Sequence, residues 1–194
     1  MLAAMLLAAL STAGCTSQRK LVETATGAER ASVRRETLLE LYERATPRLR
    51  GTMERMLREE PDAAMRAMAT EILVRIQARE SAPELTETAR RDVSWAVRAD
   101  AVAALAALLG MEAEYEIERA MQEDSEPQVR LRALREYYGL VQSESDEKRT
   151  GVLEKALADP ASIVRLRASG FMRTLTGLSA PPDLAGWNAA RSNP

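Results

Sequence analysis

The sequence lacks histidine altogether, and it has a single cysteine, Cys15, among 194 residues. Histidine is the commonest general base and metal ligand and the side chain that titrates near neutral pH, so its absence removes the usual means of acid–base and metal chemistry. One cysteine cannot form a disulfide within the chain. No glycine-rich phosphate loop is present either. We therefore expect a protein that is not an enzyme and that holds neither a metal ion nor a cofactor.

Aromatic residues are scarce, at 4%, and the formal net charge is only −2. Alanine, leucine, arginine and glutamate dominate instead, and these residues are strong helix formers that let neighbouring helices pack closely. Because the charge balance is slightly negative, no positive field draws the chain onto nucleic acid. The composition therefore predicts an all-α protein that does not bind nucleic acid.

The start of the chain is an uncharged run, Leu2 to Leu10, followed by four small residues and then Cys15. A membrane-spanning helix needs about 20 apolar residues, so this run is too short to cross a bilayer. It suits the apolar region of a secretory signal. We predict a signal peptide over residues 1–14 and export of the protein.

The segment Leu10-Ser11-Thr12-Ala13-Gly14-Cys15 resembles a bacterial lipoprotein signal, in which small residues precede a lipidated cysteine. The resemblance implies that Cys15 carries the acyl chains and anchors the protein to a membrane of the cell envelope, on the periplasmic side. Residues 15–29 would then comprise this cysteine and a polar linker. The alternatives are an ordinary cleaved signal with an incidental cysteine, or a buried helix. A start upstream of Met1 would supply the basic residues with which such signals begin.

An apolar–arginine pair recurs along the rest of the chain at intervals of 32, 32, 32 and 35 residues. The pairs are Val33-Arg34, Met65-Arg66, Val97-Arg98, Val129-Arg130 and Val164-Arg165. Small or apolar side chains mostly follow three and seven residues later, as at Ala101 and Leu105. Because these offsets share one face of an α-helix, we predict that this face is the core of five helices.

Four of the units carry an acid six residues before the arginine, at Glu60, Asp92, Asp124 and Asp159. Proline follows closely at Pro61, Pro127 and Pro160, and an N-cap followed by proline marks a helix start. We therefore predict that each helix begins near its acid. Shorter amphipathic segments precede these helices, at 46–57, 83–89, 111–121 and 146–157. Each unit is thus a pair of helices that must stack on its neighbours to bury an apolar face.

The stretch Asp159–Ala168 (DPASIVRLRA) resembles the second-helix motif of HEAT repeats, especially the short bacterial kind related to phycobilisome-lyase repeats. Asp92–Leu105 and Asp124–Leu134 resemble it as well. The resemblance implies a right-handed α-solenoid of about five helix-pair repeats over residues 30–177. It also implies that the motif acids and arginines form a structural, hydrogen-bonded row between adjacent repeats. The predicted row comprises Asp92, Asp124, Asp159, Arg66, Arg98, Arg130 and Arg165. A ligand site along this row is the alternative.

The face opposite the predicted core lies one, five and eight residues after each arginine and usually lines the concave side of such solenoids. Tyrosine and arginine are enriched at binding hot spots. We therefore predict binding contacts at Tyr42, Glu71, Arg135, Tyr138 and Arg173. The alternative is that a tyrosine here simply covers the edge of a helix.

The central segment Val93–Leu109 has only two charged residues, Arg98 and Asp100. A helix that is apolar all round is normally buried all round, so we expect its alanine row to be covered. One candidate cover is residues 178–194, predicted to be an extended tail because Pro181-Pro182 opposes helix, with Trp187 as an anchor. The other candidate is a partner protein. Alternatively, alanine tolerates water well enough to need no cover.

These features favour a membrane-anchored lipoprotein whose solenoid binds a protein or peptide without chemistry of its own. The alternative function is an accessory subunit or lyase-like enzyme acting on a cofactor-bearing protein. A pocket with convergent polar groups on the concave face would favour the enzyme. A smooth apolar groove would favour binding.

Overall fold

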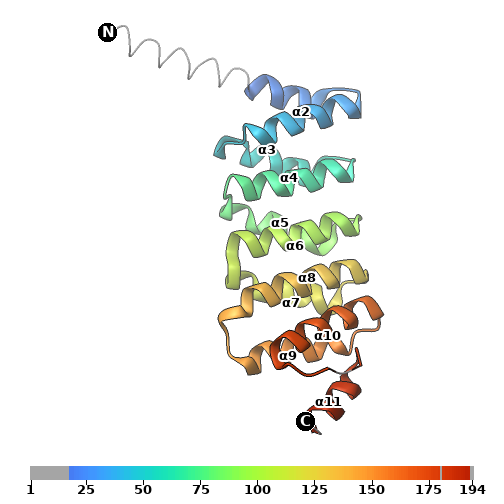
Figure 1. Cartoon of the computed structure of the whole chain (residues 1–194). Helices are drawn as coiled ribbons and strands as arrows, with labels where there is room; N and C mark the ends of the chain where they lie inside the picture. Colours follow the sequence, from blue (N-terminus) through green and yellow to red (C-terminus); the bar gives the residue numbers. More distant parts are fainter. Residues whose placement is uncertain (1–17, 180, 193–194) are drawn as a thin grey trace, which may run out of the picture. The chain divides into compact units, whose positions relative to one another are not determined.

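The computed structural model describes residues 18–179 and 181–192 of the chain, and all regular secondary structure within these ranges is helical. This confirms the predicted all-α fold. The predicted signal peptide, residues 1–14, and the predicted lipidation site, Cys15, lie outside the described residues. The chain divides into two compact units, Met1–Ser81 and Ala82–Pro194, and Figure 1 traces the helices of each.

The described part of the first unit begins with a helix over residues 18–27. It continues with α2 (Ala31–Glu43), η1 (Pro47–Leu49), α3 (Arg50–Glu59), α4 (Ala63–Arg75) and η2 (Arg79–Ser81). Here α4 packs against both α2 and α3. Proline opens the short 3-10 turn η1, a position where its missing N–H leaves no helical hydrogen bond unmade.

The second unit contains three further helix pairs and a terminal helix. In order, these elements are α5 (Ala82–Arg91), α6 (Trp95–Leu109), η3 (Gly110–Ala113), α7 (Glu114–Glu123), α8 (Pro127–Leu140), η4 (Val141–Ser143), α9 (Asp146–Leu157), α10 (Ser162–Thr176) and α11 (Leu184–Ser192). The members of each pair pack together, α5 on α6, α7 on α8 and α9 on α10. The second helices also pack in succession, α6 on α8 and α8 on α10 (Figure 1). Helix pairs stacked in this way are the arrangement that the repeat predicts.

The core of the pairs is formed by the positions that the repeat places one before, three after and seven after each arginine. In α6 these residues are Val97, Ala101 and Leu105, and all three are buried. The corresponding residues of α4, α8 and α10 are buried as well, although Val33 of α2 is partly exposed. Tyr137 of α8 is a polar side chain in this set, and its hydroxyl donates a hydrogen bond to Glu114 at 2.6 Å.

The second helices begin near their acids, as predicted, but the acid itself is not the N-cap. Each second helix of the second unit starts three residues later, at Trp95, Pro127 or Ser162. The acid instead accepts a hydrogen bond from the backbone N–H two residues ahead, at 2.7–2.9 Å in all three turns. A short carboxylate side chain closes such a turn in an extended segment and so fixes the entry into the helix.

The prediction of a linker over residues 15–29 is wrong for residues 18–27, which are helical. Ala25 of this helix is fully buried. The amide of Gln18 donates to the carbonyl of Arg44 at 3.1 Å and accepts a hydrogen bond from the Thr46 hydroxyl at the same distance. The helical part of the first unit therefore begins before residue 30.

The prediction of an extended tail over residues 178–194 is wrong for α11. The Asp183 carboxylate accepts a hydrogen bond from the N–H of Gly186 at 2.7 Å and so caps the first turn of the helix after the two prolines. Trp187 is buried, and Arg191 forms an ion pair with Glu154 of α9 at 2.9 Å. The tail is therefore tied to α9 as a helix.

The alanine row of α6 is largely covered. Ala99 and Ala106 are both buried, and Ala103 is half-buried. Helix α6 packs against α5 and α8 within its own unit. Neighbouring helices therefore cover most of the alanine row, for which the sequence analysis had named the tail or a partner protein as the candidate cover.

Candidate interaction surface

The arginines of the repeat lie in the first turns of their helices, and each side chain reaches back to the turn before its own helix. In every repeat, Nη1 of the arginine donates to the backbone carbonyl six residues before it, at 2.8–2.9 Å. The arginines that make this bond are Arg34, Arg66, Arg98, Arg130 and Arg165. A planar guanidinium has further donors at fixed angles, so one arginine can bind a second group at the same time.

For Arg34, Arg98 and Arg130, that second group is the acid of the next repeat. Arg98 binds Asp124 through two bonds of 2.8 and 2.9 Å, and Arg130 binds Asp159 through bonds of 2.7 and 2.9 Å. In the first unit, Arg34 forms an ion pair with Glu60 at 3.2 Å. We call this series of arginine–acid pairs the ladder.

The ladder changes the acidity of its members. Burial raises the pKa of Asp124, but the hydrogen bonds from Arg98 and from a backbone N–H outweigh it and hold that pKa below its ordinary value. The pKa of the Arg130 guanidinium is raised, chiefly by its hydrogen bonds to Asp159. These hydrogen bonds favour the charged forms of Asp124 and Arg130, and the pairs act as structural links between turns.

The end of the ladder lies at Arg165. Its Nη1 donates to the carbonyls of Asp159 and Pro160, both at 2.8 Å. Among the described residues no carboxylate pairs with it, because α10 is the last helix that carries the motif.

The predicted contacts of the first unit, Tyr42 and Glu71, differ in their surroundings. The Arg75 guanidinium lies over the ring of Tyr42, 4.5 Å from its centroid, and Arg75 also approaches Glu43 at 3.9 Å. Tyr42 is half-buried as a result. Glu71 of α4 is exposed. Tyr42 therefore contacts α4 through Arg75, and its role as a binding contact stays a prediction.

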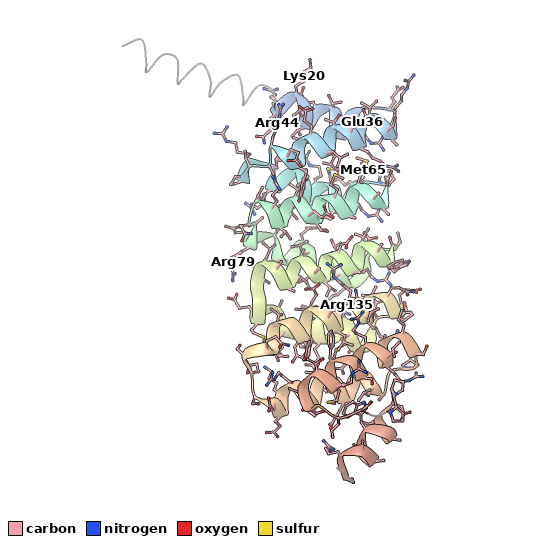
Figure 2. All side chains as sticks on the ribbon, in the orientation of Figure 1. Lys20, Glu36, Arg44, Met65, Arg79 and Arg135 are labelled. Carbon is pink, nitrogen blue, oxygen red and sulfur yellow. The ribbon has the colours of Figure 1, made fainter. Side chains whose placement is uncertain are left out.

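The predicted contacts of the second unit, Arg135, Tyr138 and Arg173, lie on the faces of α8 and α10. Tyr138 stacks on Phe171 with the ring centroids 4.1 Å apart and the planes 12° apart. Arg135, labelled in Figure 2, extends from α8 and is exposed, as is Arg173. The stacked rings connect α8 to α10, beside the exposed guanidinium groups of Arg135 and Arg173.

Between α8 and α10 lies an open hollow of about 460 Å³, which we call the arginine groove. Its lining includes Leu131, Arg135, Ile163, Leu166, Arg167 and Arg173. Ile163 and Leu166 are 48% and 64% exposed, unusually high values for large apolar side chains. The polar groups that line the groove are cationic or hydroxyl groups, with no carboxylate among the described lining residues.

A smaller hollow of about 250 Å³ continues this surface toward α6. It shares Leu131 and Arg135 with the arginine groove and adds Trp95, which is 46% exposed. Arg132 lies here too, but it is paired with Glu136 at 2.6 Å and approaches Asp100 at 3.9 Å. The apolar surface thus runs across three second helices.

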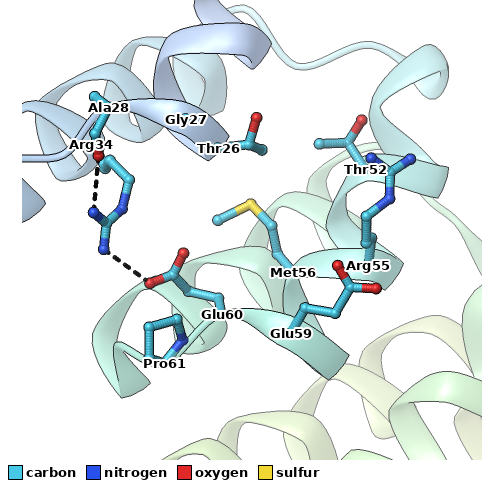
Figure 3. Close-up of a pocket in the computed structure, with 10 residues that line it drawn as sticks. All are labelled: Thr26, Gly27, Ala28, Arg34, Thr52, Arg55, Met56, Glu59, Glu60 and Pro61. Carbon is cyan, nitrogen blue, oxygen red and sulfur yellow. Dashed lines mark hydrogen bonds and ion pairs between the residues drawn. The ribbon is translucent and has the colours of Figure 1, made fainter.

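A separate cleft of about 580 Å³ lies in the first unit, between the helix over residues 18–27 and α3 (Figure 3). Arg34 at its edge is held by the carbonyl of Ala28 at 2.9 Å and by Glu60 at 3.2 Å. Arg55 and Glu59 bring opposite charges to the rim. Because its best-placed cation already belongs to the ladder, this cleft is a weaker candidate than the arginine groove.

Sequence reasoning nominated Arg135, Tyr138 and Arg173 as contacts and placed Leu166 on the predicted concave face, but it missed Ile163 and Arg167. A signal for Ile163 was present in α10, where apolar residues at 163 and 166 lie off the face formed by the buried core residues Val164 and Ala168. Apolar side chains on both faces of a helix indicate a second contact surface.

Comparison with known proteins adds one match. Residues 19–106 match the family model for HEAT repeats, which supports the resemblance seen in the motif. No curated protein matches the chain. Within the described ranges, no group of three or more Asp, Glu, His or Cys side chains is placed to hold a metal ion. The helices described there are also not long and apolar enough to cross a membrane.

Proposed function

We propose that this protein is a non-catalytic scaffold that binds another protein or peptide on the second helices of its repeats. HEAT repeats commonly serve as protein-interaction scaffolds, and part of the chain matches them. The observation that carries the proposal is the arginine groove, where Ile163 and Leu166 stand exposed beside three arginines. Apolar residues next to arginine, set in a hollow, are typical of binding hot spots.

The ladder supports binding because it makes the surface rigid. Buried two-bond ion pairs fix one turn against the next, and core alanines let the second helices approach closely. A surface held in one shape loses little conformational entropy when a partner docks. The groove lining also offers no side chain suited to accept a proton at neutral pH, which favours binding over catalysis.

We also propose that the protein is a bacterial lipoprotein, anchored through acyl chains on Cys15 to the periplasmic face of a cell-envelope membrane. The support is the string of small residues that leads into the single cysteine. Such an anchor would hold the repeats near membrane proteins and raise their effective concentration at the surface.

Anchoring is tested by replacing Cys15 with Ser and following the protein in bacterial cell fractions. We expect the full-length protein in the membrane fraction and the variant in the soluble fraction. A Ser11→Ala variant, which leaves the cysteine in place, serves as the control. Equal membrane partition of the two variants would contradict lipidation.

The scaffold function is tested by chemical crosslinking in intact cells, followed by purification of the full-length protein. We expect discrete crosslinked species that contain a second protein. Recovery of uncrosslinked chain alone, at crosslinker doses that join known neighbours in the same envelope, would contradict the proposed function.

A further inference from the structure

The arginine groove concentrates positive charge that the protein itself does not neutralise. The second unit contains twelve arginines, and eight of them have an acidic side chain within 4 Å. Among the described residues the other four have none, and three of these four line the groove: Arg135, Arg167 and Arg173. The fourth, Arg165, binds backbone carbonyls at the end of the ladder.

Apolar side chains accompany these charges. Ile163 and Leu166 lie three residues apart on α10 and so share one helical face. Leu131 of α8 lines both the groove and the smaller hollow, and Trp95 extends the apolar strip to α6. The surface therefore offers contacts to apolar groups along its length and to negative groups beside them.

We propose that the arginine groove binds an acidic amphipathic segment of a partner protein, one that presents apolar side chains and carboxylates on the same face. The inference rests on the proposed scaffold function and names the chemistry of the partner. The arginine forks bind carboxylates through two hydrogen bonds each, and the apolar strip covers leucine-like side chains.

The length of the groove suits a short helix. Helix α10 has 15 residues, which corresponds to roughly 22 Å at the standard rise of an α-helix. A partner helix of about four turns laid along α10 would bring its carboxylates past Arg167 and Arg173 in succession. Arg135 reaches the same groove from α8.

Other occupants fit the surface less well. Nucleic acid favours long positive stripes with little apolar surface, whereas this groove has two exposed aliphatic side chains at its centre and lies in a chain of net charge −2. A lipid bilayer is flat, whereas the groove is hollow and is lined in part by Phe171, on which Tyr138 stacks. A peptide segment fills a hollow and satisfies both kinds of contact.

The probe for this proposal is a synthetic 15-residue helical peptide with leucine and glutamate on one face, labelled for fluorescence anisotropy. A second peptide carries lysine in place of each glutamate. We expect the purified full-length protein to bind the acidic peptide at least about tenfold more tightly than the basic one, with an affinity that falls as salt rises.

The deciding variant changes Arg135, Arg167 and Arg173 together to Glu. We expect it to lower the affinity for the acidic peptide by about tenfold or more, since each charge pair becomes a repulsion. The matched control changes Lys20, Arg30 and Arg55 to Glu, which gives the same net charge at exposed sites of the first unit, outside the groove. If the groove variant is unfolded by circular dichroism, the same three residues are changed to Gln and the comparison is repeated.

Three outcomes would overturn the proposal. They are equal affinity for the two peptides, equal loss in the groove and control variants, and strong binding to phosphatidylglycerol vesicles without peptide binding. Self-association of the wild-type chain that the groove variant abolishes would assign the groove to a second copy instead.

Crosslinking in cells separates this inference from the scaffold function. If the groove variant still captures the same partner, the acidic-segment proposal fails and the scaffold function stands.

Discussion

Each arginine of the ladder divides its guanidinium between two turns of the chain. In Arg130, Nη1 donates to the carbonyls of Asp124 and Ser125, and Nε and Nη2 donate to Asp159. Lysine carries its three donors on one nitrogen, so it cannot form a planar two-bond pair with a carboxylate and also reach the carbonyls of the other turn. The recurrence of arginine at this position follows from that geometry.

Removing one member of a buried pair should be costly. We expect Arg130→Met to lower the free energy of unfolding by about 3 kcal/mol, because the buried Asp159 carboxylate loses its counter-charge. Urea denaturation measures the change. Arg91→Met, which removes an exposed pair with Glu87, should cost no more than about 0.5 kcal/mol. Similar losses in the two variants would show that the ladder contributes little.

The lowered pKa of Asp124 predicts how stability depends on pH. A carboxyl whose pKa is lower in the folded state stabilises the fold fully above its unfolded pKa, near the ordinary value of 3.8, and loses that contribution as pH falls through the folded pKa. We therefore expect Asp124→Asn to destabilise the protein at pH 7 and the difference from wild type to shrink below about pH 4. Denaturation at several pH values tests this, and a difference that stays constant with pH would contradict it.

At the scale of single elements, α11 shows how a short terminal helix is held. Its nine residues are too few for a helix to be stable in isolation. The helix is stabilised instead by burial of Trp187, by the cap from Asp183 and by the ion pair to Glu154. Gly186 also lies against Pro181, where any Cβ would be within 2.8 Å of the ring.

Removing the tryptophan side chain should unfold α11 and leave the other helices folded. We expect Trp187→Ala to remove hydrogen-exchange protection from α11 while the amides of α6 and α8 keep theirs, because those helices are held by their own neighbours. Asn188→Ala changes the adjacent exposed residue and serves as the control. Unchanged protection of α11 in the tryptophan variant would mean that the ion pair and cap suffice.

The sequence predicted elements where a period or motif repeated and missed them where it did not. The core face of α6 follows from three offsets that recur in every unit. The helix over residues 18–27 carries no such motif, since its apolar residues are few and Ala25 is a weak signal by itself. In the tail, Pro181-Pro182 indicated extended chain, but proline excludes helix only up to its own position and Asp183 could start one directly afterwards.

The candidate site was predictable in part for a related reason. Arg135 and Arg173 lie at offsets that face away from the core, so position alone nominated them. The exposure of Ile163 and Leu166 depends on how α10 packs against its neighbours, which the sequence of α10 alone does not state. Pairing of charges between helices is likewise a three-dimensional property, so the sequence could indicate the i,i+4 pair of Arg132 with Glu136 but not whether a carboxylate of another helix reaches Arg167.

At the scale of the whole molecule, contacts within each unit run mainly between neighbouring helices in the sequence. Such a chain is approximately one-dimensional, so its stability is a sum over repeats and the interfaces between them. Unfolding can then begin in one repeat while distant ones remain folded.

A charge buried in the last repeat tests this behaviour. We expect Ala168→Asp to cost several kcal/mol in α10 and to remove hydrogen-exchange protection from α9, α10 and α11, with α2, α3 and α4 still protected. Ser162→Asp, at an exposed position of the same helix, should have little effect. Simultaneous loss of protection in every helix would show that the chain unfolds as a single cooperative whole.

Arg165 has no carboxylate partner among the described residues, and this affects how repeats could be added to such a chain. If a copy of the repeat were inserted after α10, its aspartate would pair with Arg165 in the way that Asp159 pairs with Arg130. Arg165 therefore already has the position needed to bind a further repeat. At the other end, Ala28 stands where later repeats carry an acid, and it offers no carboxylate to an arginine of a preceding repeat or of another molecule. The acid of a repeat added after α10 would therefore find a partner in Arg165, whereas the arginine of a repeat placed before residue 28 would find no carboxylate there.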